Sequence, residues 1–129
     1  MKLLLDTHIW AWSLLEPHRL RQRVRDEITS SENEIWLSPV SLWEILALIS
    51  RRRIIVHEEP VAWVARCSAS VHEAFLTNQI VMAAHKLAFA HTDPIDRFLA
   101  ATAKVLDLTL VTADERLLGL SDIKTLANR

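Results

Sequence analysis

The feature that most restricts the fold of this chain is the alternation of short apolar segments with longer stretches of helical spacing. The clearest apolar segments are residues 3–5, 35–37 and 108–112. A strand that is apolar on both faces belongs inside a parallel sheet, because helices cover both faces of such a sheet. Strands that alternate with helices in this way predict an α/β fold with a mostly parallel sheet.

Helices are predicted where apolar residues recur at helical spacing and a capping signal opens the segment. They are residues 9–15 before Pro17, 20–28, a helix that opens at Ser38-Pro39 and ends at 51–53, then 61–69, 80–90 and 94–106. A turn region is predicted between the helices at 61–69 and 80–90. Weaker patterns predict an extended piece at 54–56, and a short helix with a last extended piece near Ile123.

The length and composition predict one globular domain over residues 1–129. Glycine is nearly absent, with Gly119 as the only one, which favours helices over tight hairpins. The single cysteine, Cys67, excludes an internal disulfide, and the apolar start of the chain is too short for a signal peptide. No apolar run reaches the length of a membrane span. We therefore expect a cytoplasmic protein with no membrane segment.

The distribution of charge is more informative than its total. The formal net charge is −1, whereas a general nucleic-acid binder is usually strongly basic. Two clusters of arginine nevertheless stand out, one formed by Arg19, Arg21, Arg23 and Arg25, the other by residues 51–53. Either cluster has the chemistry to contact phosphates, and either also fits a solvated helix face or a helix end that favours cations.

Several acidic residues stand where a parallel sheet would gather them. Asp6 follows the first strand, Asp114 follows the strand at 108–112, and Asp93 and Asp96 begin a long helix. Because ligands of open parallel sheets bind beyond the carboxyl ends of the strands, we expect these acids at one edge. Glu44 lies inside an apolar helix turn, where a carboxylate is rarely buried without a partner or a metal. We expect it to face a cleft or to be paired.

Each of these acids also has a purely structural interpretation. Asp6 and Asp93 are natural N-caps, and Asp96 suits the first turn of its helix. Thr112 is a candidate cap for a helix in which Glu115 closes a capping box. Taken together, however, acids crowded at one edge are costly unless a cation neutralises them. Hard divalent cations prefer oxygen ligands, and acids, a metal and a water suffice for phosphodiester hydrolysis without a protein nucleophile.

Four motifs follow one another along the chain: L-L-L-D-T-H, S-L-W-E-I, D-P-I-D-R-F-L-A-A-T-A and L-V-T-A-D-E. In this order they resemble the PIN-domain nucleases, and most of all the VapC-like toxins of type II (VapBC) toxin–antitoxin pairs. The resemblance covers essentially the whole chain. One departure is the segment Leu106-Asp107-Leu108, where such proteins usually carry a glycine.

The resemblance implies a set of site residues. It assigns catalysis and metal binding to four acids, Asp6, Glu44, Asp96 and Asp114. Thr112 matches a hydroxyl residue that supports the site by hydrogen bonding, and Asp93 matches an accessory acid. The four acids are intact, so the resemblance implies an active enzyme.

The resemblance also implies a fold, a cofactor and partners. Similar proteins form a three-layer sandwich, in which a mostly parallel central sheet of about five strands is flanked by helices. They use Mg²⁺ or Mn²⁺ to cut RNA. They usually form homodimers and are held inactive by a cognate VapB-like antitoxin.

Two other functions stay open. One is a non-catalytic RNA- or protein-binding module on the same fold, which sequence cannot exclude. The other is an aspartate-based phosphotransfer enzyme with Asp6 as acceptor. A haloacid-dehalogenase-like phosphatase needs a second aspartate two residues later, and that position is His8. Thr7 and Ser41 have no suitable base partner, so a hydrolase triad has no support.

The aromatic and histidine residues are less informative. We expect Trp36 and Trp43 in the core, and at least one of Trp10 and Trp12 facing a partner. The six histidines show no zinc-ligand spacing. His8 and His91 lie near acids in the sequence, but a surface or core role is the more common one for such residues.

Overall fold

The computed structural model describes residues 1–88 and 93–129. Its elements in chain order are β1 (Lys2–Leu5), α1 (Thr7–Leu15), the 3₁₀ helix η1 (Pro17–Arg19), α2 (Gln22–Thr29), β2 (Glu34–Leu37), α3 (Pro39–Ser50), α4 (Pro60–Ser68), β3 (His72–Glu73), α5 (Asn78–Lys86), α6 (Pro94–Leu106), β4 (Thr109–Thr112), α7 (Glu115–Leu118) and β5 (Lys124–Ala127). None of the described helices is long and apolar enough to cross a membrane.

The strands form one five-stranded sheet in the order β3-β2-β1-β4-β5, and every pairing is parallel. The central strand β1 pairs on both sides, since Leu4 lies opposite Trp36 of β2 and Leu110 of β4. The chain moves outward from β1 to β2 and β3, and then crosses back to β4 and β5. The direction of winding therefore reverses between β1 and β4, which is where an open parallel sheet binds its ligands.

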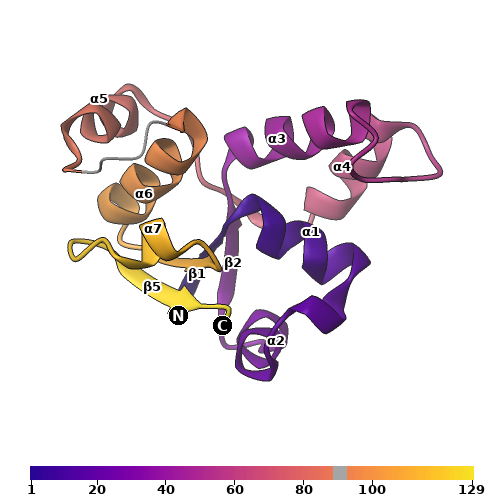
Figure 1. Ribbon diagram of the computed structural model, residues 1–129, viewed down its shortest axis with the longest axis horizontal. Helices are drawn as coiled ribbons and strands as arrows, with labels where there is room; N and C mark the ends of the chain where they lie inside the picture. Colours follow the sequence, from indigo (N-terminus) through magenta and orange to yellow (C-terminus); the bar gives the residue numbers. More distant parts are fainter. Residues whose placement is uncertain (89–92) are drawn as a thin grey trace.

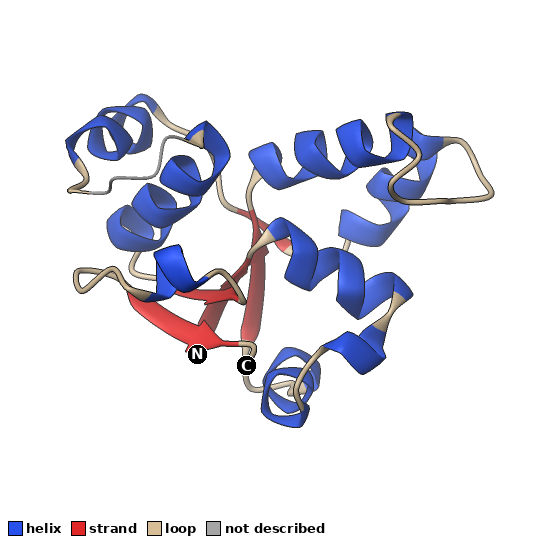
Figure 2. Cartoon of the chain, viewed as in Figure 1, coloured by secondary structure: helices blue, strands red, loops and turns tan. Residues whose placement is uncertain are grey.

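The sheet separates two apolar cores. Leu3 and Leu5 of β1 point into the core that residues of α1, α2, α3 and α4 complete. Leu4, between them, points into the opposite core, which residues of α5, α6 and α7 complete. Figures 1 and 2 show the strands between these two groups of helices. The predicted α/β three-layer sandwich with a parallel sheet of about five strands is confirmed.

Helix α6 shows how local signals set an element that later positions the site. The Asp93 side chain caps it by accepting a hydrogen bond from the backbone N–H of Ile95 at 3.0 Å. Small buried residues, including Ala100 and Ala103, let it pack closely on the sheet. It ends at Asp107, which adopts a left-handed conformation with φ of 54°. This is the position of the missing glycine, and aspartate tolerates the conformation better than most residues.

Two predictions about extended segments are wrong. Residues 54–56 form no strand, because the chain turns back at Arg52 (φ 58°) and Ile54 donates its N–H to the carbonyl of Leu48. Ile54 and Val56 pack on the core without joining the sheet, whereas Ile55 is exposed. The edge strand lies instead at His72–Glu73, inside the predicted turn region, where two exposed polar residues carry no strand pattern.

Other differences concern boundaries and burial. The helix predicted at 20–28 is α2, which begins at Gln22 and ends at Thr29, and the 3₁₀ helix η1 precedes it. The helix predicted at 80–90 ends at Lys86, and residues 89–90, like His91, lie outside the described residues. The prediction that Trp43 is a core residue is wrong, since it is 69% exposed on α3. Trp36 packs at the margin of the core and stacks on His72, whereas Trp10 is buried.

Candidate active site

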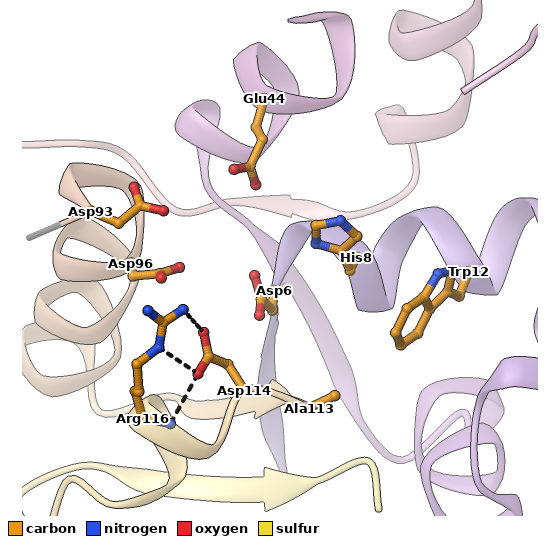
Figure 3. A pocket seen from close by; sticks show the side chains of 9 residues that line it. All are labelled: Asp6, His8, Trp12, Glu44, Asp93, Asp96, Ala113, Asp114 and Arg116. Atoms are coloured by element: carbon orange, nitrogen blue, oxygen red, sulfur yellow. Dashed lines mark hydrogen bonds and ion pairs between the residues drawn. The ribbon is translucent and has the colours of Figure 1, made fainter. Parts of the chain in front are cut away.

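The structure brings all the predicted acids to one pocket of about 390 Å³. Its carboxylates are those of Asp6, Glu44, Asp93, Asp96 and Asp114. The pocket lies where the sheet winding reverses, and Figure 3 shows the carboxylates directed toward a common space. The expectation that parallel strands gather these residues at one edge is confirmed.

The topology explains why residues so far apart in the chain meet here. Asp6 follows β1 and Asp114 follows the neighbouring strand β4, and the N–H of Asp6 donates to the carbonyl of Val111 at 3.0 Å. Helix α3 starts at the carboxyl end of β2, which places Glu44 over the same edge. Helix α6 precedes β4 and runs back along the sheet. Its first turn, which contains Asp96, therefore lies at this edge too.

Asp6 is held through both of its carboxylate oxygens. One oxygen accepts the N–H of Thr7 at 2.8 Å, and the other accepts the hydroxyl of Thr112 at 2.7 Å. Burial raises the pKa of Asp6 above its ordinary value, the hydrogen bonds from Thr112 and Thr7 act against this rise, and the charge of Glu44 adds to it. Asp6 also caps α1, so its structural and its predicted site roles coexist.

Thr112 connects two of the acids. Its side chain is fully buried, donates to Asp6, and accepts the N–H of Asp114 at 3.0 Å. The interpretation of Thr112 as a helix cap is wrong, because Asp114 caps α7 by accepting from the N–H of Arg116 at 2.9 Å. The Thr112 hydroxyl instead fixes Asp6 and Asp114 relative to each other at the end of β4.

The sequence interpretation missed Arg116. Its guanidinium binds the Asp114 carboxylate through two nitrogens, at 3.2 Å and 3.0 Å, and it faces Asp96 in Figure 3. The hydrogen bond with Asp114 raises the pKa of Arg116, and the charges of Asp96 and Asp93 add to this. Arg116 thus places a cation among the carboxylates. Its position two residues after a capping aspartate is the signal that could have indicated it.

The remaining acids differ in exposure. Asp96 is 9% exposed, so its carboxylate is almost enclosed at the wall of the pocket. Glu44 is partly exposed and its side chain enters the pocket from α3, so the expectation that it faces a cleft is confirmed. Asp93 lines the pocket while it caps α6.

The donors in the pocket suit a hard divalent cation, because they are carboxylate oxygens. Among residues 1–88 and 93–129, no three acidic, histidine or cysteine side chains are close enough to form a complete ligand set. Magnesium commonly takes one or two carboxylates and keeps several waters. The carboxylates of the pocket would therefore suit such an ion by their chemistry.

A family comparison agrees with this arrangement. The model of the PIN domain family matches residues 3–123. The chain belongs to the PIN domain family. Comparison of this PIN domain with curated protein sequences finds no significant match.

Solved structures share the fold at low sequence identity. VapBC2 from Rickettsia felis, bound to a promoter DNA fragment, is 15% identical with a TM-score of 0.75, and the match covers 98% of each chain. DNA-bound VapBC from Salmonella typhimurium is 16% identical with a TM-score of 0.75, covering 100% of this PIN domain chain and 99% of that chain. VapC20 from Mycobacterium tuberculosis, described as a sarcin-ricin loop cleaving toxin, is 19% identical with a TM-score of 0.67, covering 95% and 98%. At these identities the likeness establishes the fold.

Proposed function

We propose that this PIN domain is a metal-dependent endoribonuclease and the toxin of a type II toxin–antitoxin pair. The observation that carries the proposal is the convergence of Asp6, Glu44, Asp96 and Asp114 on one pocket where the sheet winding reverses. Membership of the PIN domain family supports it. So do the structural neighbours, which include VapBC complexes and a toxin that cleaves the sarcin-ricin loop.

The four acids would together hold Mg²⁺ or Mn²⁺, with Asp93 as an accessory acid. The bound ion would supply a nucleophile at neutral pH and charge stabilisation at the phosphate. Thr112 holds the Asp6 carboxylate in place, which limits its rotation. Arg116 neutralises Asp114 in the absence of other cations. Among the described residues, no serine, cysteine or lysine lines the pocket, so no nucleophile of these types is part of the proposal.

Partners and compartment follow the same proposal. A VapB-like antitoxin would cover the pocket, and a homodimer is expected from the resemblance alone. The cytoplasmic location and the single-domain organisation over 1–129 stay predictions.

The test is cleavage of total cellular RNA by the purified chain with Mg²⁺, with Mn²⁺ and with a chelator. We expect discrete products that need metal and that fall at least about a hundredfold in Asp96→Asn, because one carboxylate of the pocket is lost. The matched control is Asp122→Asn, which removes a carboxylate paired with Lys104 on the surface at 2.9 Å. This control should cleave like the wild type.

Each failure would have a specific meaning. Cleavage that survives Asp96→Asn at full rate would refute the assignment of the pocket. Tight RNA binding without turnover by the folded chain, with either metal, would favour the non-catalytic binding module. A stable aspartyl phosphate on Asp6 would favour phosphotransfer.

A further inference from the structure

A second cavity, which we call the basic groove, opens directly beside the acidic pocket. It has a volume of about 710 Å³. Its distinguishing lining residues are His18, Arg19, Arg21, Gln22, Arg25 and Asn128. Trp12 and Ala113 line both cavities, so the two form one continuous surface. In Figure 3, Trp12 and Ala113 lie on the side of the pocket away from Asp93 and Asp96.

The charge of the groove is opposite to that of the pocket. Three arginines and a histidine line it, and no carboxylate of the described part of the chain is among its lining residues. Arg25 is held along the groove, because its guanidinium donates to the Gln22 side chain at 2.7 Å. Arg23, on the same helix α2, does not line the groove. The first arginine cluster of the sequence is therefore divided by the fold into groove residues and a surface residue.

The buried side chain of Asn128 fixes the backbone of the groove. Asn128 is 8% exposed and accepts the N–H of Arg21 at 2.7 Å, while its amide donates to the carbonyl of Arg19 at 3.1 Å. The backbone N–H of Asn128 donates to Thr112 at the end of β4 at 2.9 Å. Asn128 thus ties the arginine-bearing segment to the strand end that leads into Asp114. The backbone that carries Arg19 and Arg21 is therefore held in place beside the pocket by tertiary contacts.

Trp12 adds an aromatic surface at the junction of the two cavities. It is partly exposed, and the Arg19 guanidinium lies 4.6 Å from the centre of its ring. A guanidinium stacked on an indole forms a flat cationic platform on which an unpaired base can stack. The aromatic ring therefore stands where the acidic pocket and the basic groove meet.

We infer that the basic groove binds single-stranded RNA on one side of the scissile phosphate, with Arg21 and Arg25 on the backbone and Trp12 against a base. This inference rests on the proposed function, because it assigns a binding site to the RNA substrate of that function. Arginine forks match phosphate oxygens, and positive grooves with stacking aromatics are the usual way to hold unpaired RNA. Arg53, of the second arginine cluster, does not line the basic groove. It lines a third cavity, which meets the basic groove at Trp12 and Arg19.

The first test measures binding of a fluorescent single-stranded oligoribonucleotide to the Asp96→Asn protein over a range of salt concentrations. Arg21→Ala and Arg25→Ala should each weaken binding and lower the slope of log K against log salt by about 0.7. Arg23→Ala is the matched control and should change neither. Trp12→Ala should weaken binding about tenfold or more with little change of slope, and Trp12→Phe should restore most of it.

Two binding results would overturn the inference. One is an equal effect of Arg23→Ala and Arg21→Ala, which would reduce the groove to general surface charge. The other is competition by poly-glutamate as effective as that of an RNA of equal charge, which would favour an acidic protein segment as the occupant.

A second experiment separates this inference from the proposed function. Wild type, Arg21→Ala and Arg25→Ala are compared in the cleavage of a dinucleotide and of a longer single-stranded RNA that contains it. We expect KM to rise only for the longer RNA, because the dinucleotide does not reach the groove. Equal kinetics of all three proteins on both substrates would refute RNA binding in the basic groove and leave the proposed nuclease function standing. Absence of cleavage by the wild type on any substrate would instead refute the proposed function.

Discussion

The hydrogen bond from Thr112 to Asp6 lends itself to a quantitative test. Thr112→Val preserves the shape of a fully buried side chain and removes its hydroxyl, so no cavity forms. The Asp6 carboxylate loses a 2.7 Å charge-assisted bond, which is worth about 1.5–3 kcal/mol. The Asp114 N–H also loses its 3.0 Å partner, an unsatisfied donor that costs about 1–3 kcal/mol if it stays buried.

These figures convert into two measurable losses. The free energy of unfolding, measured with urea in the presence of a chelator, should fall by about 2.5–6 kcal/mol. If Asp6 acts in the reaction, kcat/KM for RNA cleavage should fall about ten- to a hundredfold, as is usual when the partner of a metal ligand is removed. Asp6 would then sample orientations that the pocket cannot use.

Two variants make the result specific. Thr112→Ser keeps the hydroxyl and should retain most of the activity. Thr109→Val makes the same exchange at the opposite end of β4, away from the pocket, and should leave kcat/KM unchanged. A Thr112→Val protein that cleaves RNA within about threefold of the wild type would refute the idea that this bond positions Asp6.

Three further outcomes can be checked by unfolding experiments. The folded-state pKa of Asp6 is raised, so its ionised form destabilises the fold at neutral pH, and Asp6→Asn should unfold at higher urea in chelator. That gain should shrink as the pH falls through the pKa of Asp6 toward its ordinary value of 3.8, and a gain that grows instead would contradict the sign. The buried Ser41 hydroxyl has no hydrogen-bond partner within the described part of the chain, so Ser41→Ala should be neutral or stabilise by up to about 1 kcal/mol; a larger loss would mean that the hydroxyl is bonded. Asp107→Gly should raise Tm by a few degrees by relieving the left-handed residue, because the exposed pair with Lys124 that is lost contributes little; an unchanged or lower Tm would argue against strain there.

Much of the site could be predicted from the sequence because its signals are local. Asp6 and Asp114 follow strands whose apolar pattern is visible in a few residues, and Asp93 stands beside Pro94 at a helix start. In a parallel sheet every strand ends at the same edge, so knowing that a residue follows a strand is enough to place it there. The α/β class follows from the same alternation.

Other features were decided by tertiary contacts. The edge strand at His72–Glu73 forms because β2 pairs with it. The prediction that Trp43 is buried was wrong because α3 turns that position toward solvent. The charges of Asp96 and Asp93 act on Arg116 only because β4 and α6 pack together.

The basic groove shows the same division most clearly. The sequence by itself determined that four arginines lie close together between residues 19 and 25. Only the tertiary structure decided which of them line the groove beside the acidic pocket, through contacts of Asn128 with Arg19 and Arg21 across more than a hundred positions of the chain. Local patterns record what each segment prefers, whereas the partner that a side chain meets depends on how distant segments pack, and no short pattern carries that information.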